Sequence, residues 1–167
     1  MRIILVRHGQ AVEREDFLKE KKDDALRPLV NKGKKRSLQL AEALHSWVGG
    51  VDLLVTSPYL RAKQTAEILS YELHPQRMVE VMELIPSAPP MAFSQWLRGN
   101  VGLATTVVVV GHEPQLSSFA TWTLSGQMQS FIDLKKSGAI AIEIENLQEV
   151  KPGHGQLSFL ISPKMLD

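Results

Sequence analysis

The sequence of 167 residues contains no cysteine and no long hydrophobic run. Without cysteine there is no disulfide framework, no redox dithiol and no thiolate metal site. The first apolar run, Ile3 to Val6, is too short for the core of a signal peptide, and no later run approaches the length of a membrane-spanning helix. These absences predict a cytoplasmic protein that makes no contact with a membrane.

An excess of one charge and a high aromatic content are also lacking. Nineteen basic residues face eighteen acidic ones, which leaves a formal net charge of +1, and aromatic residues make up 6% of the chain. Such a balance creates no overall field that would attract nucleic acid or an anionic membrane. The one basic cluster, Lys32, Lys34, Lys35 and Arg36, is more typical of a solvated helix face than of a nucleic-acid contact.

The residues that are present favour one domain of the α/β class. A hydrophobic content of 44% is enough for one core, so we expect a single, monomeric domain over residues 1–167. Short aliphatic runs alternate with helical patterns, which predicts a three-layer α/β/α sandwich around a mostly parallel sheet. The expected strands are residues 2–6, 51–55, 78–82, 105–110, 138–145 and 156–162, the last two as an antiparallel pair.

The helices are expected between these strands. One starts near Asn31, a candidate N-cap residue, buries residues at the spacing of Leu38, Ala41, Leu44 and Val48, and stops at the following two glycines. Two others follow Pro58 and Pro114, and a short one covers residues 91–97. The charged residues 11–31 are expected to form an exposed loop or a loose helix.

Polar residues follow three of the predicted strands directly. Arg7, His8 and Gly9 follow the first strand, Thr56, Ser57 and Pro58 with Arg61 follow the second, and Gly111, His112 and Glu113 follow the strand "TTVVVV". In open α/β sheets, ligands bind beyond the carboxyl ends of the strands. If the three strands are parallel neighbours, two arginines and two histidines meet at one place.

Such a group of side chains is suited to an anion, and phosphate is its natural occupant. Guanidinium groups bind phosphate oxygens in pairs, and the helices that open after Pro58 and at Pro114 add free N–H groups. Gly9 would let the backbone approach an oxyanion without a Cβ in the way. The rival is a metal site, but no H-x-x-x-H or H-x-H pair occurs and only Glu113 adjoins either histidine. We therefore expect no metal and no cofactor.

These residues resemble the histidine phosphatase superfamily, which includes the phosphoglycerate mutases. The stretch "LVRHGQA" is similar to the Arg-His-Gly motif of that family, "TSPYLRAKQTAEIL" to its second block and "VVVVGHEP" to its third, in the family's order. The stretches "RPLVNKG", "VMELIPSAPP" and "SGAIAIEI" resemble the small phosphohistidine phosphatases of the SixA type. The resemblance covers nearly the whole chain and implies a compact phosphoglycerate mutase-like fold without a large lid insertion.

The resemblance also implies roles for the residues of this chain that match the motifs of the family. His8 would be the nucleophile that becomes a transient phosphohistidine, and Arg7, Arg61 and His112 would hold the phosphoryl oxygens. Glu83 is the candidate proton donor, although the acidic pattern that follows this position in the mutases is missing here. Arg27 is a candidate contact to the phosphate or to the substrate protein.

The weak acid motif favours a substrate with a good leaving group, such as the imidazole of a phosphohistidine. The sequence therefore predicts a metal-independent phosphatase of signalling type that acts on a phosphorylated protein, a phosphohistidine domain. Two alternatives stay open. One is a small-molecule phosphatase acting on sugar or nucleotide phosphates, and the other is a non-catalytic phosphate-binding module.

Overall fold

Six strands form one sheet in the order β3-β2-β4-β1-β5-β6. The computed structural model describes residues 1–89, 91–146 and 150–166. β1, β2, β3 and β4 run parallel, whereas β5 is antiparallel to both β1 and β6. The sheet is therefore mostly parallel, as predicted. The strands are β1 (Arg2–Arg7), β2 (Leu53–Thr56), β3 (Arg77–Glu80), β4 (Thr106–Gly111), β5 (Ala139–Glu143) and β6 (Gln156–Ile161).

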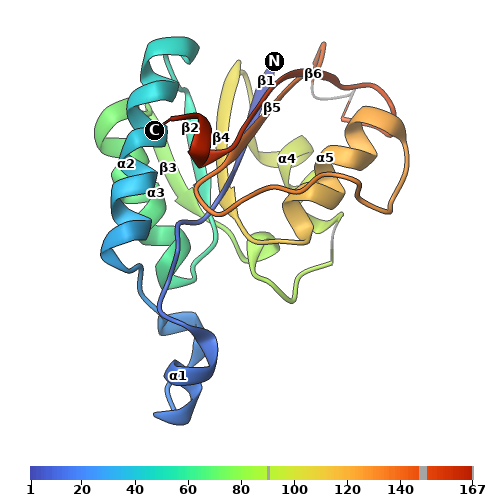
Figure 1. The fold of residues 1–167 in the computed structure, drawn as a ribbon. Helices are drawn as coiled ribbons and strands as arrows, with labels where there is room; N and C mark the ends of the chain where they lie inside the picture. Colours follow the sequence, from blue (N-terminus) through green and yellow to red (C-terminus); the bar gives the residue numbers. More distant parts are fainter. Residues whose placement is uncertain (90, 147–149, 167) are drawn as a thin grey trace.

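Helices cover both faces of this sheet, which confirms the predicted three-layer α/β/α fold. Figure 1 shows α2 and α3 on one face and α4 and α5 on the other. Each face has its own buried apolar cluster. The helices are α1 (Arg14–Lys19), α2 (Asn31–Val48), α3 (Leu60–Leu73), α4 (Ala92–Asn100) and α5 (Gln115–Ser125), with short 3₁₀ turns η1 (Asp24–Leu26), η2 (Met82–Leu84) and η4 (Pro163–Met165).

The valine run of β4 explains why this strand lies in the interior of the sheet. Val107 and Val109 belong to the cluster under α4 and α5, while Val108 and Val110 belong to the cluster under α2 and α3. Successive side chains of a strand point to opposite faces, so a strand covered on both sides needs apolar residues without alternation. The position of β4 between β2 and β1 follows from this requirement.

Two local predictions differ from the structure at the start of α2. Asn31 is the first helical residue, and Val30 is the N-cap without a side-chain hydrogen bond. The reason is that an isolated bridge between Ala11 and Leu29 and a hydrogen bond from Val30 N to Gln10 O hold the preceding chain extended up to Val30. Leu38, expected on the buried face, is 40% exposed.

Residues 12–28 form a lobe that projects from the body of the molecule. It contains α1 and η1, and it lies at the end of the sheet where β1, β2 and β4 finish (Figure 1). Between β3 and β4 the described residues form only η2 and the short helix α4. Among the described residues, no helix combines the length and apolar character needed to span a bilayer.

Candidate active site

The three polar strand ends meet at one edge of the sheet. Arg7 pairs with Gly111 across β1 and β4, and Thr56 pairs with Val110 across β2 and β4. The ladder continues beyond the strands, because His8 N donates to Gly111 O at 3.1 Å and Ser57 N donates to Val110 O at 3.0 Å. The chain positions that follow β1, β2 and β4 are therefore direct neighbours.

A cleft of about 320 Å³ opens over this edge, and the four predicted catalytic residues line it together. The two histidine rings lie with their centroids 4.9 Å apart. The wall is rich in cations, since Arg14, Arg27 and Lys136 join Arg7 and Arg61 there. The structure thus brings together residues that stand more than a hundred positions apart in the chain. The convergence expected from the strand ends is confirmed.

His8 is held as a neutral imidazole by hydrogen bonds at both ring nitrogens. Its Nδ1 lies 2.7 Å from the carbonyl oxygen of Gly9. A carbonyl oxygen only accepts hydrogen bonds, so Nδ1 carries the proton and Nε2 keeps its lone pair. The Nε of Arg61 donates to Nε2 at 3.3 Å, which agrees with this tautomer.

The charge state of His8 follows from its surroundings. Burial lowers the pKa of His8 to about 3, and the guanidinium groups of Arg61 and Arg7 act in the same direction, although the bond to Gly9 opposes them. Removing a charge from water is unfavourable unless an opposite charge is near, and here the near charges are positive. His8 is consequently unprotonated at Nε2 throughout the neutral range.

His112 has a similar environment. Burial and the neighbouring His8 ring lower the pKa of His112 to about 2. Its Nε2 lies 2.9 Å from Ser57 Oγ, and that hydroxyl oxygen also accepts a hydrogen bond from Tyr59 N at 3.3 Å. Its Nδ1 is buried and has no partner among the described residues. A buried imidazole nitrogen without a partner is costly, so His112 is prepared to bind a further polar group.

Arg7 and Arg61 are fixed by different partners. Arg7 Nη1 donates to Leu134 O at 2.9 Å, and its buried Nε has no partner among the described residues. Arg61 is 3% exposed, and besides His8 it contacts Asp24, donating from Nη1 to the backbone oxygen at 2.9 Å and from Nη2 to Oδ2 at 3.1 Å. Both guanidinium groups are therefore oriented before any ligand enters.

Asp24 is a site residue that the sequence did not single out. Its carboxylate accepts from Arg61 and from the Nε of Arg27 at 3.0 Å, and Arg14 lies 3.7 Å away. Burial raises the pKa of Asp24, but Arg61 and Arg27 outweigh this effect and hold the pKa below its ordinary value. Asp24 connects the lobe to α3 through Arg61 and also contacts Arg14 and Arg27. Nothing in the local stretch distinguishes it from Asp23, because its partners are distant in sequence.

Arg27 and Gly9 occupy well-defined places. Arg27 lines the cleft, and its Nη1 donates to Val12 O at 2.7 Å. Gly9 lies against α2, where the structure leaves no room for a side chain. Its N–H donates to Thr65 Oγ1 at 3.0 Å, and a Cβ there would stand 2.7 Å from Ser37 Oγ and 2.9 Å from Gly33 O.

The structure places Glu113, and not Glu83, on the wall of the cleft. Glu83 lies in η2, where its backbone oxygen accepts from Gln115 Nε2 at 2.6 Å. Glu113 lines the cleft, and its Oε1 accepts from Ser117 N at 3.0 Å, at the start of α5. Burial raises the pKa of Glu113, and its hydrogen bonds with Ser117 only partly offset this. The "GHEP" motif contained this residue, but only the fold shows which glutamate faces the cleft.

Metal-binding groups of three or more His, Asp or Glu side chains do not occur among the described residues. The cleft is lined instead by two imidazoles, four guanidinium groups and one lysine, together with the carboxyl groups of Glu13, Asp24 and Glu113. The imidazole and guanidinium groups suit an anion with several oxygen atoms, as a phosphoryl group has. A neutral, correctly protonated imidazole beside it can attack phosphorus.

Comparisons with known proteins agree with this chemistry. The sequence model of the histidine phosphatase superfamily (branch 1) matches residues 3–85. An uncharacterized protein of Picosynechococcus sp. is 35% identical over 168 residues, which cover 99% of each chain. The phosphohistidine phosphatase SixA of Escherichia coli is 25% identical over 166 residues, which cover 98% of this chain and 94% of that protein.

Solved structures show the same fold. The structure of the protein histidine phosphatase SixA complexed with tungstate matches with a TM-score of 0.84 and 23% identity, over 100% of both chains. The predicted fold, a phosphoglycerate mutase-like arrangement of SixA type, is confirmed by this match.

Proposed function

The chain belongs to the histidine phosphatase superfamily, and from that premise we propose that it removes a phosphoryl group from a histidine side chain of another protein. The family supports phosphatase activity as such. The proposal adds the substrate, a protein phosphohistidine, and the route, a covalent phosphohistidine intermediate on His8.

One observation carries the proposed route. His8 Nδ1 is bonded to Gly9 O, so Nε2 presents its lone pair in a cleft lined by arginines. Phosphoryl transfer requires little covalent chemistry from a protein beyond a placed nucleophile and positive charge around the equatorial oxygens. Arg7 and His112, each with a buried nitrogen that lacks a partner among the described residues, together with Arg61, supply the groups that hold those oxygens.

The reaction then has two displacements. His8 Nε2 forms a bond to phosphorus while the bond between phosphorus and the substrate's imidazole nitrogen breaks. The substrate's ring takes a proton from water and leaves as a neutral imidazole. In the second step water attacks phosphorus and gives a proton to the solvent, the bond between phosphorus and His8 Nε2 breaks, and inorganic phosphate leaves. The electron pair of that bond stays on Nε2, so His8 returns to its neutral form. The cations of the cleft stabilise the charge on the phosphoryl oxygens in both steps.

Two features support a protein substrate. Of the described residues between β3 and β4, which form only η2 and α4, Pro86 alone lines the cleft, so this segment is short enough to admit a side chain presented on another protein's surface. An imidazole is a good leaving group, so this substrate does not require Glu83, which is not among the residues that line the cleft.

A specific observation favours the second candidate, a small-molecule phosphomonoesterase. Glu113 lines the cleft, and burial raises its pKa, which suits a carboxyl group that gives a proton to an alkoxide leaving group. A sugar or nucleotide phosphate has such a leaving group. A panel of phosphohistidine proteins, alkyl phosphates and aryl phosphates ranks the two candidates by kcat/KM.

The nucleophile is tested with His8→Asn, and His45→Asn, an exposed residue of α2, is the control. We expect His8→Asn to fold normally and to lose phosphatase turnover by at least about a thousandfold, because no other residue provides the covalent step. Brief incubation of the parent protein and of His45→Asn with a ³²P-labelled phosphohistidine protein should leave an acid-labile, base-stable label that His8→Asn lacks. Near-normal turnover in His8→Asn would contradict the assignment.

A further inference from the structure

The start of α2 carries cations where a helix is least suited to hold them. Lys32 and Arg36 stand four residues apart and so share one face of the helix. The first turn contains no acidic residue. The N-terminus of a helix has a partial positive charge, which disfavours lysine and arginine there. Lys32 lies in this first turn and gains no stability from the helix dipole, whereas Arg36 lies one turn further on and is held by a hydrogen bond to Pro163 O.

The start of α2 is tied to the loop before β5, which brings two more lysines to the cleft. Ser37 Oγ and Ser137 Oγ lie 3.1 Å apart, and Ser137 N is shared between Arg7 O at 3.1 Å and His8 O at 3.3 Å. Ser137 takes a left-handed conformation with φ of 56°. Lys135 and Lys136 precede it and are both exposed, and Lys135 forms an ion pair with Asp133. Lys136 also lines the cleft.

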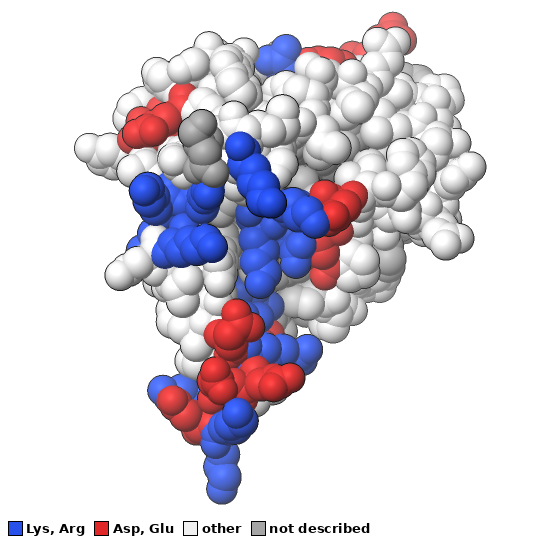
Figure 2. Space-filling model, in the orientation of Figure 1, with Lys and Arg blue, Asp and Glu red and all other residues white. Residues whose placement is uncertain are grey.

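A third segment joins the same side of the molecule. Arg36 Nη1 donates to Pro163 O at 2.9 Å, so η4 lies against the first turns of α2. Lys164 of η4 is exposed. Figure 2 shows lysine and arginine side chains gathered over these three segments, with acidic side chains bordering them toward α5. We call this surface the basic rim, and it consists of Lys32, Arg36, Lys135, Lys136 and Lys164.

We propose that the basic rim is a docking surface for an acidic patch on the phosphorylated protein, whose carboxylates surround its phosphohistidine. The inference rests on the proposed function and names the surface by which that substrate is recognised. The rim adjoins the cleft through Lys136, while Glu113 stands on the cleft wall at the start of α5. A partner with carboxylates on one side of its phosphohistidine is attracted by the rim and repelled from the α5 side, which orients the phosphoryl group toward His8.

Protein is the class of partner that this surface fits. None of the five rim residues is aromatic, whereas proteins that bind single-stranded nucleic acid stack bases on aromatic side chains. The net charge of the chain is only +1, so its positive field is local to this rim and does not follow an extended polyanion. Exposed lysines add little to folding stability, so recognition explains their gathering better than structure does.

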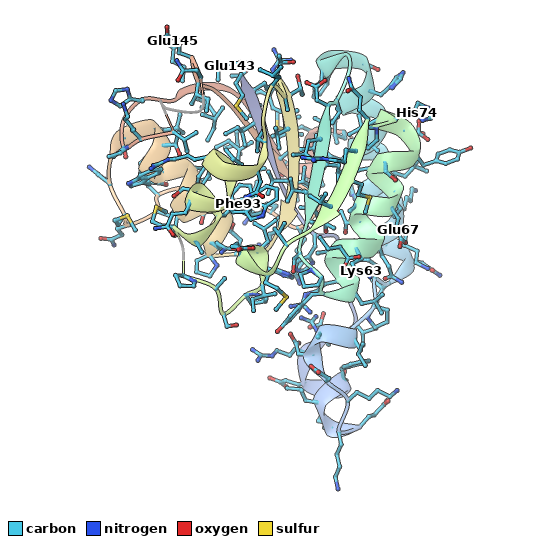
Figure 3. The ribbon with its side chains drawn as sticks, turned by 180° about the vertical axis from the view of Figure 1, so that it is seen from behind. Lys63, Glu67, His74, Phe93, Glu143 and Glu145 are labelled. Atoms are coloured by element: carbon cyan, nitrogen blue, oxygen red, sulfur yellow. The ribbon has the colours of Figure 1, made fainter. Side chains whose placement is uncertain are left out.

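The test compares two pairs of charge reversals. Lys32→Glu/Lys164→Glu removes two cations of the rim, and Lys136 is left intact because it lines the cleft. The control, Lys34→Glu/Lys63→Glu, makes the same change in net charge elsewhere. Lys34 shares the first turn of α2 with Lys32 but lines a groove toward α3 together with Glu67. Figure 3 shows Lys63 and Glu67 on the outer side of α3. Lys32→Glu and Lys34→Glu place an acid near the N-terminus of α2, which favours folding, whereas Lys63→Glu loses the ion pair of Lys63 with Glu80 at 2.8 Å, so thermal unfolding of both variants is measured before the kinetics.

Two substrates separate docking from chemistry. One is free phosphohistidine. The other is a small helical domain with aspartate and glutamate around its histidine, phosphorylated with phosphoramidate. We expect the rim variant to lose at least about tenfold in kcat/KM on the acidic domain at low salt and to keep its rate on free phosphohistidine. The control should match the parent protein on both, and added salt should reduce the difference between the variants.

Other outcomes overturn the proposal. Equal losses in both variants would mean that only the overall charge matters. A loss on free phosphohistidine as well would place the lysines in phosphate binding. Binding of RNA or of anionic vesicles that depends on Lys32 and Lys164, with no change on the acidic domain, would assign the rim to a different anion. If the parent protein hydrolyses aryl phosphates but neither phosphohistidine substrate, the proposed function fails and the docking surface fails with it. If it hydrolyses free phosphohistidine but not the acidic domain, docking alone fails.

Discussion

At the scale of single residues, the reactivity of the cleft depends on which nitrogen or oxygen is left free. His8 uses Nδ1 for Gly9 O and keeps Nε2 for chemistry. The carboxylate of Asp24 lies against Arg14, Arg27 and Arg61, so we interpret Asp24 as a residue that positions these arginines. Glu113 accepts a hydrogen bond from Ser117 N through Oε1 and has no arginine partner as close as those of Asp24. Asp24 and Glu113 therefore differ in role.

The role of Glu113 is tested with Glu113→Gln, which keeps the shape and the hydrogen bond to Ser117 N. We expect a loss of about a hundredfold in kcat on alkyl phosphates, because general acid catalysis is removed. The rate on phosphohistidine should change by less than about threefold, since its leaving group needs little help. Steady-state kinetics on the two substrates provides the measurement. Glu83→Gln is the control, and a larger loss in that variant would return the proton donor to Glu83.

At the scale of elements, the site depends on how closely α2 approaches the loop after β1. Gly33 of α2 stands so near that a Cβ would lie 2.1 Å from Gln10 O. Gly9, in the loop after β1, lies equally close to α2, because a Cβ there would stand 2.9 Å from Gly33 O. Two glycines in contact let the helix begin directly behind His8, where it also supports the loop of Ser137. The close packing of α2 thus positions the nucleophile without touching it.

A methyl group at Gly33 should break this contact. We expect Gly33→Ala to lower the free energy of unfolding by about 3 kcal/mol, because the obstacle is backbone and cannot move aside. The displaced loop should also reduce kcat at temperatures where the variant is folded. Gly99→Ala in α4 is the matched control, since nothing lies within 4 Å of its Cβ. It should raise stability by up to about 1 kcal/mol. Urea unfolding measures both, and equal effects would refute the argument.

At the scale of the whole molecule, the fold brings two imidazoles and an excess of positive groups together in one cleft. The sheet order places β2, β4 and β1 side by side, and their carboxyl ends deliver both histidines to one buried point. The pKa of His8 falls to about 3 and that of His112 to about 2, from an ordinary value of 6.5. Folding therefore excludes two protons that the unfolded chain takes up in mild acid.

Stability should consequently fall as the pH decreases. Both folded pKa values lie below the unfolded value, so the stabilisation is complete above pH 6.5 and is lost as pH decreases toward the folded values. Each histidine contributes a slope of about 1.4 kcal/mol per pH unit between about pH 6 and pH 4. Urea titrations in phosphate-free buffer measure it. His8→Asn and His112→Asn should each remove about half of this contribution, and an unchanged slope in the double variant would contradict it.

Much of this architecture is predictable from the sequence because it depends on local patterns. The uninterrupted valines of β4, the alternation of β5 and the apolar spacing of the helices are determined by which faces each element must bury. Arg7, His8, Arg61 and His112 were predictable as a group because each follows a strand of a parallel sheet. The helix start at Asn31 was less predictable, because a tertiary bridge at Leu29 outweighs the local capping preference.

The sequence by itself determined the fold class, the family and the group of residues from which the proposed nucleophile, His8, comes. Only the tertiary structure decided that His8 Nε2 keeps its lone pair, that Asp24 holds the arginines, that Glu113 and not Glu83 lines the cleft, and that lysines from three segments form one rim. The physical reason is that periodicity and motif order are properties of neighbouring residues. A tautomer, a shifted pKa or a charged surface depends on groups that become neighbours only when the chain has folded.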